Sequence, residues 1–227
     1  MQTSLLRVAY QGVPGAFGEQ AVRRVWRDGA LARPMPTFAA ALEALLIGAA
    51  EWAVIPVWNS IIGRVAPGCD ALERYPRVIE QVNDVDVPVH QCLVAIPGTT
   101  IDDLRWVGSH PAALAQCARF FEAHPALAPV TAFDTAGSAL ELASYGEHTL
   151  NADERWYARL GAERPSQLAA ICSEYAARKY RLAVLARDVH DEPGNVTRFA
   201  VVCANATAPA PRAQRSTRRA SSAAASA

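Results

Sequence analysis

The chain has almost no lysine and no long apolar run. Of its 22 basic residues only Lys179 is a lysine, and 22 acidic residues balance them. A net charge of zero gives no sign of a basic surface for nucleic acid. No run of 18 apolar residues is present, so the sequence predicts no membrane-spanning helix. The N-terminal segment is too short and too strand-like for a signal peptide.

Patterns typical of metal and cofactor sites are also missing. The five cysteines are scattered and form no Cys-x-x-Cys motif, which favours reduced, buried thiols in a cytoplasmic protein. The five histidines lack ligand spacing, and no Gly-x-Gly-x-x-Gly motif follows a strand. No Ser-His-Asp order and no His/Cys nucleophile pair stands out. If the protein is an enzyme, we expect it to use neutral hydrogen-bond donors and helix ends on an anionic substrate.

Segments with strand and helix periodicity alternate along the chain, which predicts an α/β fold with mainly parallel sheets. Strands are expected at 5–12, 51–57, 77–98 with an interruption at Pro88, 128–134, 182–189 and 196–204. Helices are expected at 16–26, 38–50, 109–124, 135–146 and 166–180.

The long strands around Pro88 suggest a crossing between two lobes. We place the first lobe at 1–88 plus 186–203 and the second at 89–185. Residues 204–227 are rich in Ala, Ser, Pro and Arg without an apolar period, so they are expected to form a disordered tail. The cleft between the lobes is the expected binding site, because ligands of α/β folds bind at strand ends.

Polar residues gather where the predicted strands end. Asn59 and Ser60 follow one strand, and their side chains can hydrogen-bond a carboxylate or a hydroxyl. Ser109 precedes a helix as a candidate N-cap, and Gln116 lies two turns further along. Thr135 stands at another strand end, where a helix begins. Each of these residues also has an ordinary explanation as a cap or turn residue.

The motif Asn-Val-Thr-Arg-Phe at 195–199 opens the last predicted strand. Side chains alternate along a strand, so Thr197 and Phe199 face one side and Arg198 the other. Thr197 is then expected to face the cleft, while Arg198 anchors the lobe. The alternative is a Thr chosen for its strand propensity beside a surface Arg.

Seven segments in order resemble the catalytic domain of prephenate and arogenate dehydratases. They are AYQGVPGAFGE, AVIPVWNSIIGRV, VPVHQCLVAIPG, GSHPAALAQC, FDTAGSALELA, AAICSEYAARKY and GNVTRFAVV. The resemblance covers the chain up to about residue 203. It implies a two-lobed α/β fold similar to periplasmic binding proteins, with the active site in the interlobe cleft. It also implies a homodimer or larger homo-oligomer.

The resemblance further implies a reaction. Prephenate loses CO₂ and its ring hydroxyl to give phenylpyruvate, and aromatisation drives the step, so neither a metal nor an organic cofactor is needed. Thr197 matches the residue that assists departure of the hydroxyl. The residues that match substrate-orienting positions are Asn59, Ser60, Ser109, Gln116 and Thr135. Arg198 and Phe199 match positions that support the threonine.

The sequence departs from the family pattern at several positions. Trp58 stands where the family has Glu, Ala112 replaces a Gln, and Gly18 replaces a Ser. The segment 144–166 is longer than usual. Two alternatives therefore stay open: a prephenate decarboxylase that does not aromatise its product, and a non-catalytic module that binds a small aromatic acid. Because no regulatory ACT domain is recognisable in the sequence, we expect no feedback inhibition by phenylalanine through such a domain.

Overall fold

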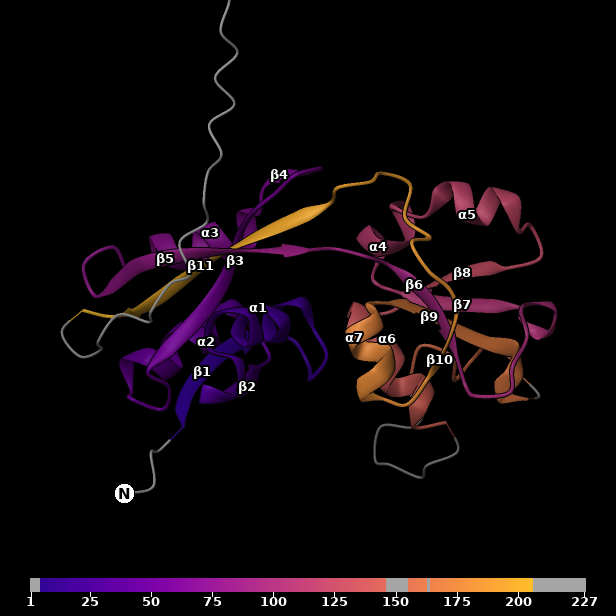
Figure 1. Ribbon diagram of the computed structural model, residues 1–227, viewed down its shortest axis with the longest axis horizontal. Helices are drawn as coiled ribbons and strands as arrows, with labels where there is room; N and C mark the ends of the chain where they lie inside the picture. The colour runs from indigo at the N-terminus through magenta and orange to yellow at the C-terminus, as the bar shows by residue number, and fades with distance from the viewer. Residues whose placement is uncertain (1–4, 146–154, 163, 206–227) are drawn as a thin grey trace, which may run out of the picture.

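The computed structural model describes residues 5–145, 155–162 and 164–205, which form two lobes with one β-sheet each. The lobes lie side by side (Figure 1). The expected tail lies outside the described residues from 206 onward, as do residues 146–154 and 163 of the long segment 144–166. Within the described part of the chain, no helix is long and apolar enough to cross a membrane.

The first lobe is a sheet covered by helices on both faces. Val54 and Val201 pack towards α1 (Phe17–Trp26), whereas Ile55 and Val202 pack towards α2 (Phe38–Leu46) and α3 (Ala66–Glu73). This alternation buries both faces of the central strands. In order across the sheet the strands are β2 (Ala30–Met35), β1 (Leu6–Gln11), β3 (Trp52–Asn59), β11 (Val196–Ala204) and β5 (Ile79–Pro88), with β4 (Gly63–Arg64) paired to β3.

The second lobe repeats this layered plan. Helices α6 (Thr135–Ala143) and α7 (Glu174–Lys179) cover one face of its sheet, and α4 (Pro111–Ala115) and α5 (Ala118–Ala123) cover the other. The strands, in order, are β10 (Ala183–Ala186), β6 (Cys92–Ala95), β9 (Leu168–Cys172), β7 (Trp106–Ser109) and β8 (Ala128–Thr131).

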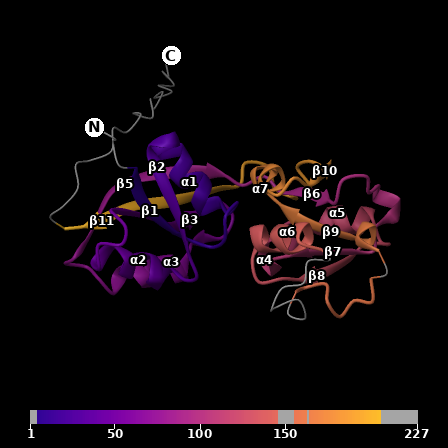
Figure 2. The same ribbon diagram turned by 90° about the horizontal axis from the view of Figure 1, so that it is seen from below.

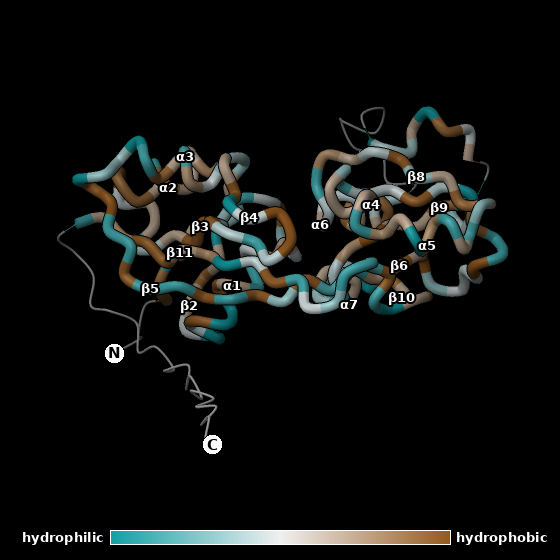
Figure 3. Tube along the Cα trace, turned by 90° about the horizontal axis from the view of Figure 1, so that it is seen from above, coloured by the Kyte–Doolittle hydropathy of each residue, from teal (hydrophilic) through white to brown (hydrophobic). Residues whose placement is uncertain are grey.

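Short 3₁₀ helices lie in both lobes: η1 (Arg27–Gly29) in the first, and η2 (Ile101–Asp103) and η4 (Pro165–Gln167) in the second. In both lobes the hydrophobic segments lie along the strands (Figure 3).

The chain crosses between the lobes twice, at residues 89–91 and 187–195 (Figure 1). Backbone hydrogen bonds join the two crossings: the Val89 amide donates to the Asn195 carbonyl at 2.8 Å, and the Val189 amide donates to the Gln91 carbonyl at 2.9 Å. The first lobe is consequently assembled from both ends of the described chain.

A third connection joins α1 to α7, on the sides of the lobes that face each other (Figure 2). Lys179 Nζ of α7 lies 2.9 Å from Glu19 Oε1 of α1, and Gln20 Nε2 donates to Ser173 Oγ at 3.1 Å. The lone lysine of the chain therefore joins the two lobes.

The sheets are mixed, so the expectation of mainly parallel sheets was wrong. β1 runs parallel to β2 and β3, but β11 runs antiparallel to both β3 and β5. In the second sheet β7 runs parallel to β8 and β9, while β6 runs antiparallel to β9 and β10. The second crossing adds β11 antiparallel to a sheet that βαβ units began, and the first crossing leads into β6, which runs antiparallel to both of its neighbours.

The helix expected at 166–180 was also wrong in its first half. Residues 168–172 form β9, all five fully buried between β6 and β7, and only Glu174–Lys179 is α-helical. A short apolar run buried on both faces has no alternation, so its periodicity does not separate a strand from a helix.

The helix expected at 109–124 is two helices, α4 and α5, that meet at Gln116 and Cys117. Asp191 of the second crossing causes the break. Its carboxylate accepts hydrogen bonds from the Ala118 and Arg119 amides at 2.9 and 3.0 Å, and so caps α5 from outside. A cap more than 70 residues away leaves no local sequence signal.

Candidate active site

A cavity of about 430 Å³ lies between the two lobes, near the crossings. The ends of β1, β3 and β11 bound it on one side, and the N-terminal ends of α4, α6 and α7 bound it on the other. Its wall is largely apolar, with a few amides and hydroxyls, as is usual for small-molecule sites. The lining residues are Gln11, Gly15, Ala16, Phe17, Gly18, Phe38, Val54, Pro56, Asn59, Ile62, Val65, Val89, His110, Gln116, Phe133, Asp134, Thr135, Ala136, Ser173, Asn195, Thr197 and Phe199.

A bulge in β3 directs Asn59 into this cavity. Thr197 lies opposite Asn59 and Phe199 lies opposite Pro56, so Val57 is the additional residue on β3. One extra residue reverses the side-chain alternation, which places Asn59 on the same face as Pro56. The regular alternation of β11 meanwhile places Thr197 and Phe199 in the cavity wall, as the sequence predicts.

The same bulge turns Trp58, which stands where the family pattern has Glu, away from the cavity wall. Trp58 is 42% exposed and pairs with Arg198 across the two strands. The Arg198 guanidinium carbon lies 5.9 Å from the centre of the Trp58 ring, and Arg198 Nε donates to Asp86 Oδ1 at 2.8 Å. Arg198 thus anchors the edge strand β5 on the opposite face of the sheet.

A buried hydrogen-bond network holds the Thr197 hydroxyl. Asn59 Nδ2 donates to Thr197 Oγ1 at 3.0 Å and to Asn195 Oδ1 at 2.7 Å. The side-chain oxygen Oδ1 of Asn59 accepts hydrogen bonds from the backbone amides of Ile61 and Ile62 at 2.9 and 3.2 Å. These bonds fix the orientation of the Asn59 side-chain amide. Thr197 Oγ1 is therefore an acceptor towards Asn59, and its own proton remains available for a group in the cavity.

Asn195 extends this network to the second lobe. It is only 3% exposed, and its Nδ2 donates to Gln116 Oε1 at 3.2 Å. A continuous chain of amides thus runs from Gln116 at the end of α4, through the second crossing, to Asn59 and Thr197. Asn195 was not among the predicted site residues, because its place at the crossing depends on the tertiary fold.

The remaining predicted residues divide into two groups. Thr135 lines the cavity at the start of α6, which Asp134 caps. Ser109 does not line it: the side chain is fully buried, its hydroxyl donates to the Ile171 carbonyl at 2.8 Å, and His110 is the N-cap of α4 instead. The expected cap role of Ser109 was therefore wrong.

Ser60 also lies outside the cavity wall. Its hydroxyl donates to the Gly194 carbonyl at 3.2 Å and accepts from the Val196 amide at 2.9 Å. These bonds tie the end of β3 to the second crossing. Ser60 thus fixes the segment that carries Thr197 rather than facing the cavity.

The electrostatics of the cavity come from the backbone rather than from cationic side chains. Among its described lining residues there is no arginine or lysine. Helix α1 points its N-terminal end at the cavity through Ala16, Phe17 and Gly18, and no side chain caps it. The first-turn amides of a helix carry partial positive charge, so this end suits an anion.

Glu19 holds the Gly-rich turn that forms this wall. It is 3% exposed, and its carboxylate accepts from the Gly15 amide at 2.6 Å and from Lys179 Nζ at 2.9 Å. Burial raises the pKa of Glu19, but these two bonds more than offset burial and leave the pKa below its usual value. Glu19 and Lys179 were not predicted as a pair, although the lone lysine of the chain was an available signal.

Potential metal ligands lie elsewhere. Within the described ranges, the single group of three or more His, Cys, Asp or Glu side chains with clustered ligand atoms is His90, Asp188 and His190. All three belong to the crossings, outside the cavity wall.

Two α/β lobes joined by two crossings, with a cavity between them, define a two-lobed α/β fold whose cavity has the position and lining typical of small-molecule sites. The family model for prephenate dehydratase matches residues 8–207, and the chain belongs to this family.

The relatives agree with this assignment. Arogenate dehydratase 5, chloroplastic, from Arabidopsis thaliana is 38% identical over 197 residues, which cover 86% of this chain and 41% of that protein. The chain spans less than half the length of such curated relatives.

Two solved structures share the fold. A prephenate dehydratase from Arthrobacter aurescens in complex with L-Phe has a TM-score of 0.74 and 29% identity, over 90% of this chain and 62% of that one. GqqA, described as a novel type of quorum quenching acylase, has a TM-score of 0.72 and 32% identity, over 90% and 66%.

Proposed function

We propose that the chain catalyses the decarboxylating dehydration of prephenate to phenylpyruvate. The observation that carries the proposal is the Thr197 hydroxyl, which lines the cavity and accepts a hydrogen bond from Asn59. In the reaction the bond between the ring and its carboxylate breaks, and its electron pair moves through the ring to expel the hydroxyl on the opposite carbon. CO₂, water and an aromatic ring result, once a proton reaches the leaving oxygen.

Thr197 supports this step as a positioned donor. A threonine hydroxyl is a weak acid in water, so orientation in a largely apolar cavity contributes more than its intrinsic acidity. Because Asn59 already donates to Thr197 Oγ1, the threonine proton is free to donate to a group bound in the cavity. Aromatisation supplies the driving force, so the chemistry itself needs no cofactor.

The wall of the cavity suits a ring that carries two carboxylates. Phe17 and Phe199 offer apolar surface to the ring, while the uncapped N-terminal end of α1 and the Gln116 amide offer donors to carboxylates. Thr135 offers a further hydroxyl at the start of α6. We assign these groups to binding and orientation, and Ser60, Ser109 and Arg198 to support of the surrounding backbone.

Arogenate is the second candidate substrate. It carries an ammonium group where prephenate carries a ketone, and the Asp134 carboxylate lines the cavity. The relatives named as arogenate dehydratases favour the same substrate. The ratio of kcat/KM for the two substrates decides between them.

The first experiment incubates the purified protein with prephenate and identifies the product by ultraviolet spectrum and mass. Phenylpyruvate supports the proposal. A decarboxylated product that keeps its hydroxyl favours the non-aromatising alternative. Ligand-dependent melting without turnover of prephenate or arogenate favours the binding module.

Thr197→Ala tests the assigned role. We expect turnover to fall by about 10²- to 10³-fold, because one donor to the leaving group is lost. Thr197→Ser, which keeps the hydroxyl, is the matched control and should retain most of the rate. Near-normal turnover by a folded Thr197→Ala protein would remove Thr197 from the mechanism.

We further propose that the protein works in the cytoplasm as a homodimer or larger homo-oligomer, without feedback inhibition by phenylalanine through an ACT domain. The five free cysteines support a reducing compartment. Light scattering measures the oligomer, and saturable inhibition by phenylalanine would contradict the lack of feedback.

A further inference from the structure

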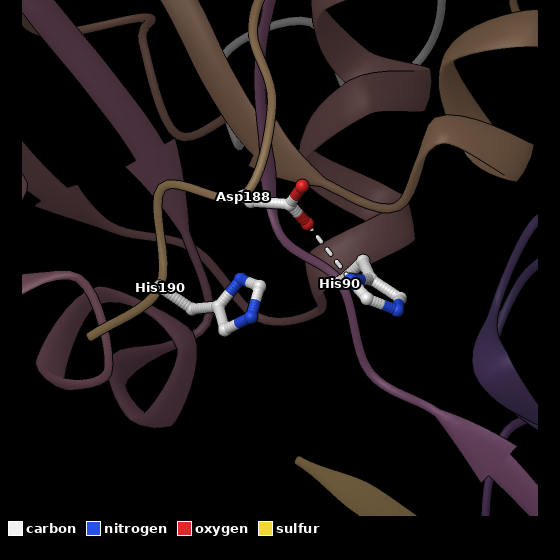
Figure 4. A group of neighbouring side chains, drawn as sticks. All are labelled: His90, Asp188 and His190. Atoms are coloured by element: carbon white, nitrogen blue, oxygen red, sulfur yellow. Dashed lines mark hydrogen bonds and ion pairs between the residues drawn. The ribbon is translucent and has the colours of Figure 1, made fainter. Parts of the chain in front are cut away.

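Three side chains with metal-ligand chemistry meet where the two crossings run side by side. His90 lies on the first crossing, and Asp188 and His190 lie on the second (Figure 4). One potential ligand atom from each residue lies within 4.8 Å of the other two. We propose that these three residues bind a single divalent transition-metal ion, of which Zn²⁺ is the representative.

The geometry is close to that of a bound site. His90 Nδ1 and Asp188 Oδ1 are 2.8 Å apart, and the two imidazole centroids are 5.6 Å apart at an angle of 76°. Two ligand atoms at about 2.0–2.1 Å from a tetrahedral Zn²⁺ are about 3.4 Å apart. Small rotations of the exposed side chains of His90 and Asp188 therefore bring all three ligands to one ion.

The backbone around the cluster is held independently of any ion. Val189 stands between the two ligands of the second crossing; it is 7% exposed, and its amide donates to the Gln91 carbonyl at 2.9 Å. Gln91, next to His90, is 2% exposed. Buried anchors thus alternate with outward-facing ligands on both segments, so the backbone that carries the ligands is already ordered before an ion binds.

Asp188 has a backbone conformation that fits this role. Its φ is +52°, in the left-handed region that only a few residue types adopt readily. This conformation turns the carboxylate towards His90, with which it makes the 2.8 Å contact.

The ligand set selects the class of ion. Two imidazoles and one carboxylate favour Zn²⁺, Co²⁺ or Ni²⁺ over Mg²⁺ and Ca²⁺, which prefer oxygen ligands. A cavity of about 370 Å³ beside His90 and Asp188 leaves space for water as the remaining ligand. Arg178 and Arg187 line the same cavity, and Glu174 pairs with both, at 3.2 and 3.3 Å, which offsets part of their charge.

An ion at this position joins the two segments that connect the lobes. The cluster lies outside the wall of the proposed active site, so the ion acts as a brace on the crossings and takes no part in the chemistry. The competing explanation is a plain contact between His90 and Asp188, with His190 Nδ1 held by a hydrogen bond from the Gln91 amide at 3.4 Å.

Titration calorimetry of the full chain, without an added histidine tag, distinguishes a metal site from a plain contact between His90 and Asp188. We expect one equivalent of Zn²⁺ to bind, and Co²⁺ to bind with visible bands that Zn²⁺ displaces. His90→Ala, Asp188→Ala and His190→Ala should each weaken binding by about tenfold or more, since loss of even an indirect partner of a metal ligand costs about 10- to 100-fold.

His124→Gln is the matched control, because His124 hydrogen-bonds Phe120 far from the cluster in sequence and should not affect binding. A Cys69→Ser background removes the one partly exposed described thiol as a competing ligand. The melting temperature of the unsubstituted chain, but not of the three ligand variants, should rise with Zn²⁺.

Absence of binding, or binding that all three ligand substitutions leave unchanged, would overturn the proposal. Because the readouts are binding heat, spectrum and melting temperature, the result does not depend on the proposed dehydratase activity.

Discussion

The hydrogen bond from Asn59 determines whether the Thr197 hydroxyl acts as a donor or as an acceptor towards a ligand. The Asn59 side-chain amide donates a hydrogen bond to Thr197 Oγ1, and two backbone amides hold it in this orientation. The Thr197 oxygen therefore already accepts one hydrogen bond from the protein. Asn59 owes its position to the bulge at Val57. The sequence suggested Asn59 from its place at a strand end, but a bulge has no reliable sequence signature, so the opposite position of Trp58 was not predictable.

At position 18 the packing leaves little room for any side chain larger than that of glycine. A Cβ there would lie 3.0 Å from Tyr10 Cδ2 and 3.1 Å from Tyr10 Cβ, and Tyr10 is 1% exposed. We therefore expect Gly18→Ser, which introduces the hydroxyl of the family pattern, to lower the free energy of unfolding by about 1–3 kcal/mol. Urea denaturation measures the change.

Gly29→Ser is the control for this substitution, because a Cβ at Gly29 meets no atom within 4 Å. It should change stability by no more than about 0.5 kcal/mol. An unchanged denaturation midpoint for Gly18→Ser would show that Tyr10 can move.

At the scale of elements, α1 and α7 are joined by one charged pair. Glu19 Oε1 and Lys179 Nζ are 2.9 Å apart, and Glu19 is buried whereas Lys179 is partly exposed. We expect Glu19→Gln to destabilise the protein by roughly 1–3 kcal/mol at neutral pH, between the values for exposed and buried pairs. A double-mutant cycle with Lys179→Gln isolates the pair.

The pH dependence of this effect follows from the lowered pKa of Glu19. A carboxyl whose folded pKa lies below its unfolded value stabilises the fold above the unfolded value, and this contribution is lost as pH falls through the folded pKa. The difference between wild type and Glu19→Gln should be complete at pH 7 and shrink below about pH 4.5. A difference that grows in acid would contradict this assignment.

The sequence predicts helix α1 well, because its apolar residues recur at helical spacing on one buried face. Strand β11 also lies at its expected position, although both faces of its second half are buried. β9 was mistaken for a helix because both its faces are buried, and the α4–α5 break was missed because Asp191 comes from a distant segment. The candidate site follows the same rule: Thr197 was predictable from alternation, whereas Asn195 and Glu19 depend on contacts between lobes.

For the whole molecule, the cavity has an apolar rim contributed by both lobes. Phe133 of the second lobe is 83% exposed and Ile62 of the first lobe is 63% exposed, although both line the cavity. Burial of such a ring contributes about 1.5–3 kcal/mol. We expect phenylpyruvate to bring the lobes together and lower the radius of gyration in small-angle scattering.

Pyruvate, which lacks the ring, is the control ligand for this experiment and should leave the radius of gyration unchanged. A radius that stays constant at saturating phenylpyruvate would mean that the lobes bind the product without moving.

The central place of β11 has a consequence for synthesis of the chain on the ribosome. β3 and β5 flank β11, and their common neighbour is made only after the strands of the second lobe. At about 5–20 residues per second, the interval between Pro88 and Val196 lasts roughly 5–20 s. During that time the nascent first sheet has two unpaired edges, which are prone to aggregation. The second lobe, in contrast, has all five of its strands by Ala186, so it is able to fold first and present the crossing from which β11 completes the molecule.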